Sequence, residues 1–243
     1  MSAGKTEIDL SKYEKKIYSQ NGEDGVIEKI FEMIGTTSKN YVEFGVEGGW
    51  ECNTRYIRES CGWYGLLMDM GYENHTINLQ KEVITAENIN SLFTKYQVPQ
   101  EFDMLSIDID FNDFYIWKEI SKHYRPRVVV IEYNATHLPN IDKVAVYHPY
   151  SYWDGSNYFG ASILALYRLG NKTEYSLIYA EDRGINLFFI RDDVLDRCPI
   201  QFKDTNCVDL IYKYPKYGSG PNGGHNADPF NRSYLSADFL LKY

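Results

Sequence analysis

The sequence predicts an α/β protein with a doubly wound, mostly parallel sheet of seven strands. Short apolar segments alternate with segments of helical periodicity between residues 22 and 133, as βαβ units do. Residues 128–131 are uniformly apolar, which is typical of a strand buried on both faces. The last two expected strands, 175–179 and 185–190, are separated by only five residues. Because this connection is too short for a crossover helix, it predicts an antiparallel hairpin.

The individual elements follow from local patterns along the chain. A helix is expected at 22–35, where Asp24 suits the first turn, Gly35 suits the C-cap, and apolar residues recur at helical spacing: Val26, Ile27, Ile30, Phe31 and Ile34. The remaining strands are expected at 41–44, 63–69, 83–86, 104–109 and 127–133. The remaining helices are expected at 53–60, 73–81, 90–96, 113–123 and 160–169.

The length and composition favour one domain. The chain has 243 residues, of which 44% are hydrophobic, and this fits one large α/β domain better than two small ones. The core of this domain is expected at about 17–195. The alternation of strands and helices is interrupted at about 135–159, and the tail at 196–243 is expected to be irregular, with a glycine-rich loop at 218–229.

Charge and hydropathy exclude several classes of partner. The formal charge is −9, from 34 acids against 25 bases, whereas a nucleic-acid platform needs a net basic face. No apolar run approaches the roughly 20 residues of a membrane helix, and the N-terminus lacks an apolar signal core. The four cysteines show no C-x-x-C spacing, which weakens a zinc site or a disulfide framework. We therefore expect a soluble, cytoplasmic protein with reduced thiols, no nucleic-acid partner and no membrane partner.

Two strand ends carry residues typical of nucleoside binding. The first strand runs into the glycine-rich segment 43–49, where the backbone can approach a ligand closely. Asp69 ends the second strand, 24 residues after Gly45, and an acid at this position can accept both hydroxyls of a ribose. Glu87 and Asn88 follow the third expected strand, where polar groups would face an adenine. The glycines alone also fit a tight turn, but together with the acid they favour nucleoside binding.

Five segments carry motifs in a characteristic order: SQNGED at 19–24, EFGVEGG at 43–49, SIDIDFND at 106–113, RVVVIE at 127–132 and GAS at 160–162. In order and spacing they resemble, over about residues 17–195, the FkbM-like family of class I S-adenosylmethionine-dependent methyltransferases. The third segment resembles the D-x-E-G-x-E signature of that family. The resemblance implies a Rossmann-like class I methyltransferase fold with a closing antiparallel hairpin, and S-adenosylmethionine as cofactor.

The resemblance also assigns the residues around the cofactor. Glu43 would hold the methionine amino group, and glycines would admit the methionine backbone. Asp69 would take the ribose hydroxyls, and Asp108 would lie beside the transferring methyl group. The implied cofactor-binding set is Gln20, Glu43, Gly45, Glu47, Gly49, Asn53, Thr54, Asp69, Glu87, Asn88 and Asp108.

Three features qualify this assignment. Glu47 replaces the middle glycine of motif I, so the loop must accommodate a side chain there. Phe111 stands where the family has glycine. Asn53 and Thr54, which would close with Gln20 over the methionine carboxylate, also fit a simple helix N-cap.

Four carboxylates fall near two adjacent strand ends: Asp108, Asp110, Asp113 and Glu132. Such acids repel one another unless a cation or bound protons relieve them, and oxygen-rich clusters suit magnesium or calcium. Some sugar O-methyltransferases with related sheets hold magnesium in such a cluster and deprotonate a hydroxyl there. By this resemblance Asp110, Asp113 and Glu132 are candidate magnesium ligands, and Asp108 and Asp110 are candidate catalytic residues. Alternatively, Asp113 caps the next helix and Asp110 faces solvent.

The interruption at 135–159 is rich in tyrosine and tryptophan. It follows the fifth strand and is expected to lie as a lid over the carboxyl ends where ligands bind, although it also fits ordinary loop packing. His137 and His148 within it are candidate general bases, since histidine titrates near neutral pH, and His225 in the tail could fold back over the site. Any one of these histidines is more often structural than catalytic.

The predicted function is methyl transfer from S-adenosylmethionine to an oxygen or nitrogen nucleophile of a small-molecule or glycan-like acceptor, with magnesium as a second cofactor. Two other functions remain open at this point. One is a metal-dependent glycosyltransferase that uses Asp108-x-Asp110. The other is a protein that binds S-adenosylmethionine without transfer, in which Glu47 and Phe111 mark decay of the site.

Overall fold

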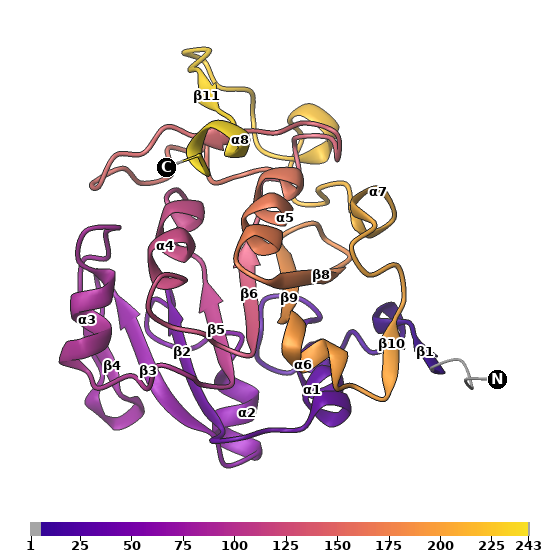
Figure 1. Cartoon of the computed structure of the whole chain (residues 1–243). Coiled ribbons are helices and arrows are strands. Elements are labelled where there is room, and N and C mark those ends of the chain that lie inside the picture. The colour runs from indigo at the N-terminus through magenta and orange to yellow at the C-terminus, as the bar shows by residue number, and fades with distance from the viewer. Residues whose placement is uncertain (1–5, 243) are drawn as a thin grey trace.

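A seven-stranded sheet forms the centre of the computed structural model, which describes residues 6–242 (Figure 1). In spatial order its strands are β4 (Leu79–Lys81), β3 (Tyr64–Asp69), β2 (Asn40–Phe44), β5 (Met104–Ile107), β6 (Val128–Glu132), β9 (Asn186–Arg191) and β8 (Tyr175–Ala180). Strands β2 to β6 pair in parallel, whereas β9 is antiparallel to both β6 and β8. The predicted mostly parallel sheet with a closing hairpin is confirmed.

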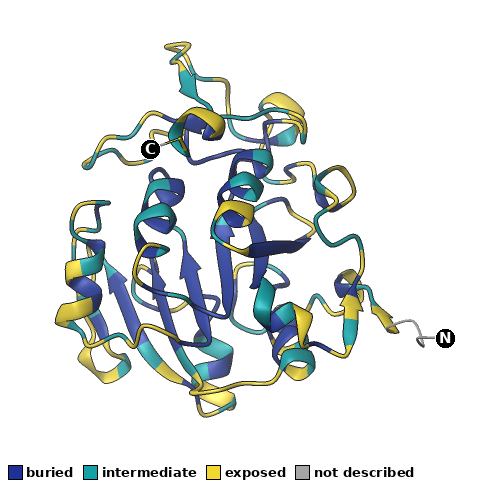
Figure 2. Cartoon of the chain, in the orientation of Figure 1, coloured by how far each residue is buried: buried dark blue, intermediate teal, exposed yellow. Residues whose placement is uncertain are grey.

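Helices cover both faces of the sheet. One face carries α1 (Glu23–Ile34), α2 (Arg55–Ser60) and α6 (Asp192–Asp196). The other carries α3 (Ile89–Lys95), α4 (Asp113–Ile120) and α5 (Ile163–Lys172). Successive residues of β6 alternate between the two apolar cores, because side chains of a strand point to opposite faces. Figure 2 shows the central strands almost entirely buried between the helical layers.

Helix α1 lies where the helical spacing of apolar residues predicts it. Of its predicted apolar positions, Val26, Ile27 and Ile30 are fully buried, Phe31 is buried, and Ile34 at the end of the helix is partly buried. It ends at Gly35, which has a φ of 67° and donates its backbone N–H to the carbonyl of Phe31 at 2.9 Å. Glycine adopts this left-handed conformation without steric cost. The prediction of a helix at 22–35 is confirmed.

The prediction for residues 73–86 is wrong. In place of a helix at 73–81 the chain forms a single 3-10 turn, His75–Ile77, and then β4, which pairs with β3. Asn74 caps the turn by accepting the Thr76 N–H at 3.1 Å, and Leu79 is fully buried. Residues 83–86, expected as the third strand, are not a strand, and Val83 is 51% exposed. One buried leucine in a polar stretch is too weak a signal to reveal a three-residue strand.

The tail is more ordered than predicted, because it pairs with distant segments. β10 (Ile200–Phe202) pairs with β1 (Thr6–Ile8), and β11 (Tyr234–Leu235) pairs with β7 (Val144–Ala145) in the interruption. The short elements η1 (Leu10–Lys12), α7 (Val208–Ile211), η3 (Pro221–Gly223) and α8 (Ala237–Leu240) complete the described chain. None of the helices within residues 6–242 is long and apolar enough to cross a membrane.

Candidate active site at the carboxyl ends of the strands

A cavity of about 890 Å³ lies at the carboxyl ends of β2, β3 and β5. This is the point where the strand order reverses, with β3 on one side of β2 and β5 on the other, and doubly wound sheets bind ligands at such a point. Gly45 lets the two strand ends meet, because a Cβ there would lie 1.4 Å from the carbonyl oxygen of Asp108. The volume is within the usual range of small-molecule sites.

Glu43, at the end of β2, is held by the turn that begins α2. Its Oε1 accepts the backbone N–H of Asn53 at 2.7 Å, and its Oε2 accepts the backbone N–H and the hydroxyl of Thr54 at 2.9 and 2.5 Å. Burial raises the pKa of Glu43, and these hydrogen bonds oppose the rise. Thr54 is the N-cap residue, but its side chain donates to Glu43 and does not accept from the helix. Glu43 and Asn53 line the cavity, and Thr54 does not.

Asp69, at the end of β3, holds the loop that follows β2. Its Oδ2 accepts the backbone N–H of Glu47 at 2.8 Å, and its Oδ1 accepts that of Gly71 at 2.7 Å. Glu47 adopts the left-handed conformation, with a φ of 47°, and its side chain is exposed. The loop therefore accommodates the side chain that replaces the middle glycine. Gly49 closes the turn by donating to the carbonyl of Val46, and it does not line the cavity.

The N-terminal segment SQNGED brings Gln20 to the cavity. One oxygen of Asp24 accepts three successive backbone N–H groups, those of residues 17–19, at 2.6 to 2.8 Å. Glu23 accepts from the side chain of Asn186 at 2.9 Å and so ties the segment to β9. The sequence prediction missed these two positioning residues, although both acids belong to the motif itself.

The predicted adenine-facing residues lie elsewhere. Glu87 accepts a hydrogen bond from the hydroxyl of Tyr147 at 2.5 Å. Asn88 is the N-cap residue of α3, and its side chain accepts the backbone N–H of Thr85. Neither lines the cavity, whose wall here consists of Glu82, Val83 and Ile84. The difference follows from the misplaced strand. The sequence predicts that this strand ends at residue 86, whereas β4 ends at residue 81, so the residues that follow the strand and face the cavity come five positions earlier in the chain. The cavity also has a rim of exposed apolar side chains: Trp50, Met70, Val83, Tyr150 and Tyr152.

Three of the four expected carboxylates come together. Asp108, Asp110 and Glu132 each offer an oxygen within 4.8 Å of the others. Burial raises the pKa of Asp108 and of Glu132 well above the ordinary range, and the neighbouring acids raise them further. Burial also raises the pKa of Asp110, which has a φ of 64°. Within the described chain, Oε2 of Glu132 is buried and has no hydrogen-bond partner.

Asp113, the fourth carboxylate, is separate from this group. It is the first residue of α4, and its Oδ1 accepts the backbone N–H of Ile109 at 2.8 Å. Burial raises its pKa to about 7. Of the predicted magnesium ligands, the structure therefore brings Asp110 and Glu132 together with Asp108, and it leaves Asp113 at the start of the helix.

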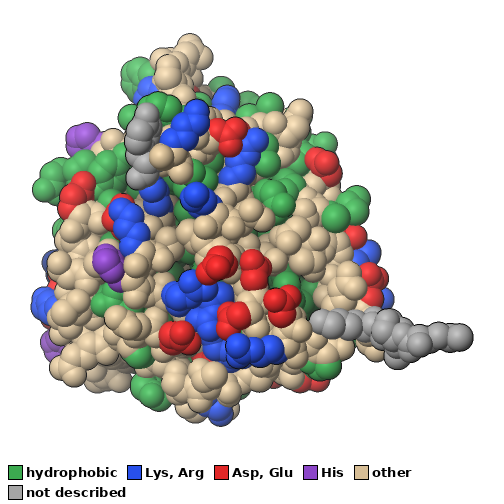
Figure 3. Space-filling model, in the orientation of Figure 1, with side chains coloured by type: hydrophobic (Ala, Val, Ile, Leu, Met, Phe, Trp, Pro, Cys, Tyr) green, Lys and Arg blue, Asp and Glu red, His purple; other side chains and the backbone are tan. Residues whose placement is uncertain are grey.

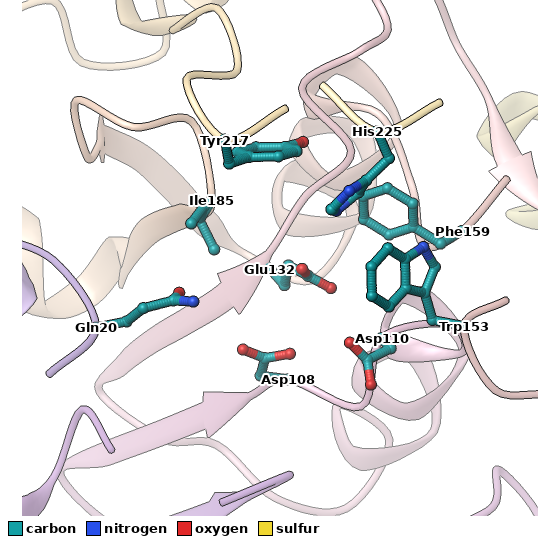
Figure 4. Close-up of a pocket in the computed structure, with 9 residues that line it drawn as sticks. All are labelled: Gln20, Asp108, Asp110, Glu132, Trp153, Phe159, Ile185, Tyr217 and His225. Carbon is teal, nitrogen blue, oxygen red and sulfur yellow. The ribbon is translucent and has the colours of Figure 1, made fainter. Parts of the chain in front are cut away.

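A second, smaller chamber of about 210 Å³ adjoins the first (Figure 4). The two share Gln20, Asp108 and Asp110 as walls. Glu132 lies on the floor of the smaller chamber, and its other walls are Trp153, Phe159, Ile185, Tyr217 and His225. The ring of His225 contacts those of Trp153, Tyr217 and Phe159, at centroid distances of 4.3, 4.8 and 5.7 Å. Among the described residues, no lysine or arginine lines this chamber.

The aromatic walls come from two distant segments, 144–159 and 217–235, which we call the cap. β7 and β11 pair across them, and Arg232 binds Asp154 at 2.6 Å and Asp228 at 3.0 Å. The hydroxyl of Tyr158 donates to the carbonyl of Ser233 at 2.8 Å. In Figure 1 the cap lies above the arrowheads of β5 and β6, the side where a lid was predicted.

His137 and His148 line neither chamber. His137 is buried edge-on against Tyr234, and burial lowers its pKa to about 4. His148 is exposed, and its Nδ1 accepts the backbone N–H of Tyr150 at 3.3 Å. His225, from the glycine-rich loop, is the histidine on the site, and burial lowers its pKa.

The charged surface is mixed on the face shown in Figure 3, where acidic side chains lie beside basic ones. Ion pairs between exposed side chains include that of Arg125 with Glu174 at 2.8 Å. This face therefore carries no uniformly basic patch of the kind that nucleic-acid binding uses.

The order of the sheet, with β9 antiparallel between β6 and β8, is that of the class I methyltransferase fold. No family model matches the chain, and no curated protein matches it. Solved structures similar to it include an S-adenosylmethionine-dependent methyltransferase from Clostridium acetobutylicum, with a TM-score of 0.38 and 9% identity over 70% of this chain and 90% of that one. Another is a SAM-dependent methyltransferase from Aquifex aeolicus, with a TM-score of 0.31 and 11% identity over 67% and 88%. Both likenesses are distant, and the fold class rests on the topology of this sheet.

Proposed function

We propose that this protein transfers a methyl group from S-adenosylmethionine to an oxygen or nitrogen nucleophile of a small-molecule or glycan-like acceptor. The observation that carries the proposal is the junction of two chambers at Asp108. A wide cavity at the switch point of the sheet suits a nucleoside, and the smaller chamber beside it suits an acceptor. The reacting atoms would meet at their common wall.

The larger cavity fits the proposed cofactor in its chemistry. Each oxygen of Asp69 accepts one backbone N–H and keeps a further acceptor site for a ribose hydroxyl. Met70 and Val83 offer apolar surface for an adenine ring. At the other end, Glu43, Asn53 and Gln20 are polar groups for the methionine part. When bound, S-adenosylmethionine supplies a methyl group already activated on a sulfonium.

The residues of the chain then have two tasks. The first is positioning, because holding two reactants in line contributes several kcal/mol to lowering a barrier. The cap and the strand ends would do this and exclude water. The second is removal of the acceptor proton, for which Asp108 and Glu132 are suited because burial raises their pKa above the ordinary range of a carboxyl group.

Magnesium assistance is the finer part of this proposal. Asp108, Asp110 and Glu132 present oxygens, the donor type that Mg²⁺ prefers, and Oε2 of Glu132 has no partner among the described residues. These three residues would hold the ion, which lowers the pKa of a bound hydroxyl. A positive charge on the acceptor itself would relieve the same carboxylates, so a metal ion and a cationic acceptor are competing occupants of the cluster.

A calorimetric titration with S-adenosylmethionine and S-adenosylhomocysteine tests the proposal. We expect both to bind, and a ligand at ~100 times its Kd stabilises the native state by about 2.7 kcal/mol. Asp69→Ala is expected to weaken both by at least about tenfold, or 1.4 kcal/mol, whereas Glu73→Ala, an exposed control, is not. Binding of a nucleotide sugar in place of both nucleosides would favour the glycosyltransferase alternative and overturn the proposal.

A turnover assay separates catalysis from simple binding. With S-adenosylmethionine and pooled amine and alcohol acceptors, we expect S-adenosylhomocysteine to accumulate. Glu132→Gln and Asp110→Asn are expected to lower this rate while leaving nucleoside affinity unchanged. Tight binding without any conversion of the cofactor would instead identify a non-catalytic binding protein.

A further inference from the structure

The smaller chamber has two halves of different chemistry. Three carboxylates, Asp108, Asp110 and Glu132, line one part of it, and the aromatic rings lie beside and above them in the view of Figure 4. We infer that it binds a small organic amine as the methyl acceptor, with the ammonium group among the carboxylates and the apolar body against the rings. The transfer step rests on the proposed function, but binding of the amine does not.

The charge of the chamber selects against anions and favours cations. Three acids lie within 4.8 Å of one another, and among the described residues no lysine or arginine faces them in the chamber. Like charges at this distance repel, and a cation relieves the repulsion. An acceptor that bears a phosphate or a carboxylate would add to the repulsion. The chamber therefore fits a ligand group that is positively charged.

One carboxylate oxygen in this chamber lacks a partner. Oε2 of Glu132 is buried and accepts no hydrogen bond from any described residue, whereas buried polar atoms in proteins are normally paired. An ammonium group has three donors and no acceptor. It would satisfy Glu132 and the neighbouring acids at the same time, which a single hydroxyl donor would not.

The aromatic wall adds the second half of the recognition. Trp153 and Tyr217 pack against His225, and all three rings line the chamber. Burial lowers the pKa of His225, which favours the neutral imidazole, the form that does not repel a cation. Aromatic faces attract cations and also pack against apolar groups. A primary amine on a short hydrocarbon body uses both properties.

Other occupants use only part of the chamber. A hydrated metal ion would satisfy the carboxylates but leave the rings without a ligand. A neutral sugar would stack on the rings but leave the three acids without a compensating charge. An amine satisfies both halves with one molecule, and it occupies the place that a metal ion would need.

The transfer step balances without a further reactant. The ammonium gives one proton to a carboxylate of the cluster, and the free nitrogen lone pair attacks the methyl carbon. A C–N bond forms while the C–S bond breaks, and its electron pair returns to sulfur. The products are the neutral thioether S-adenosylhomocysteine and a methylated ammonium, with the transferred proton left on the carboxylate.

Binding of matched probes without nucleoside tests the inference. Propylamine and benzylamine are titrated calorimetrically at pH 7 in the presence of a chelator, each against the alcohol of the same skeleton. We expect each amine to bind at least about tenfold more tightly than its alcohol. Equal affinities for amine and alcohol, or binding of neither, would overturn the inference.

Variants locate the site. Glu132→Gln keeps the size of the side chain, and we expect it to weaken the amine at least about tenfold while leaving S-adenosylhomocysteine affinity within about twofold. Trp153→Leu is expected to weaken benzylamine more than propylamine. Glu73→Gln, an exposed acid outside both chambers, serves as the matched control. Amine binding that survives Glu132→Gln unchanged would also overturn the inference.

Two further outcomes are distinguishable. Tight binding of Mg²⁺ alone, with no binding of amines to the chelated protein, would assign the carboxylates to the metal and overturn the amine. Amine binding that depends on Glu132, without any binding of S-adenosylmethionine or S-adenosylhomocysteine, would support the chamber as an amine site and overturn the proposed methyl transfer. The first result concerns this inference and the second concerns the function on which its chemistry depends.

Discussion

The two chambers meet at Asp108, but the carboxylates that line them differ in the hydrogen bonds they accept. In the larger one, Glu43 and Asp69 accept five hydrogen bonds between them, mostly from backbone N–H groups. In the smaller one, Glu132 keeps a buried oxygen without any partner among the described residues. The first pair is satisfied by the fold itself. The second chamber holds charge that the fold does not compensate.

This difference distinguishes carboxylates that hold the site together from carboxylates that are available to bind a ligand. A satisfied carboxylate fixes a loop and can still accept a hydroxyl, as expected for a preformed nucleoside cavity. A carboxylate that lacks partners is costly to bury and is retained where it has a task. The two kinds of acid should therefore respond oppositely to substitution.

Loss of Glu43 should give the largest effect on stability. Glu43→Ala leaves the buried N–H groups of Asn53 and Thr54 without an acceptor, and each unsatisfied group costs about 1–3 kcal/mol. We expect the free energy of unfolding to fall by about 3–5 kcal/mol in urea denaturation. Glu43→Gln, which keeps one carbonyl oxygen, should lose less.

Glu132→Gln supplies the contrast to this prediction. It removes a buried acid, whose raised pKa means that burial opposes its ionisation, without removing any hydrogen bond that the described residues make. Stability at pH 7 should therefore be unchanged or higher. A loss for Glu132→Gln as large as that for Glu43→Ala would remove the distinction between the two chambers.

The sequence predicted the site residues that directly follow an easily recognised strand. The glycine loop, Asp69, Asp108 and Glu132 each follow a strongly apolar segment, so their place at one edge of a parallel sheet could be deduced. The adenine-facing residues were misplaced because β4 is short and polar, and an error of a few positions in a strand changes every residue after it.

The cap and the N-terminal segment show a second limit. Tyr217 and His225 reach the smaller chamber because the tail packs against a segment about 70–90 residues earlier in the chain: β11 pairs with β7, and Asn157 donates its backbone N–H to the carbonyl of Asn226. A period in the sequence reveals local structure but not a pairing at such a distance. For the same reason, no pattern indicated that Glu23 would contact Asn186 across the fold.

The next largest effect should be on the pH dependence of stability, through the buried acid Asp113 at the start of α4. Burial raises the pKa of Asp113 from 3.8 to about 7, so the native state binds a proton that the unfolded chain has released. Its contribution to stability is present at low pH and is lost as the pH rises through about 7. For Asp113→Asn, the fall in stability between pH 5 and pH 7 should be smaller than in the wild type by about 2 kcal/mol.

Denaturation curves at several pH values measure this slope. Asp228→Asn is the matched control, because the pKa of Asp228 is lowered to about 2, chiefly by its hydrogen bond with Arg232. This control should leave the slope between pH 5 and pH 7 unchanged. An identical slope for Asp113→Asn and wild type would mean that the buried acids are not protonated in the native state.

Arg232→Ala should have the smallest effect on global stability. It tests whether the cap supports the smaller chamber alone or both chambers. Arg232 joins the two cap segments through Asp154 and pairs with Asp228 within its own segment. Its side chain is 32% exposed, and surface ion pairs are worth about 0–1 kcal/mol. We expect little change in the unfolding midpoint and faster amide exchange in residues 151–158 and 226–235, because weakly held segments open locally. Nucleoside affinity should stay within about twofold, since β2, β3 and β5 build the larger cavity and the cap supplies only residues 149–152 of its lining. Arg197→Ala, outside the cap, should change neither. If Arg232→Ala instead weakened the nucleoside as strongly as Asp69→Ala, the cap would support both chambers and their separation would not hold.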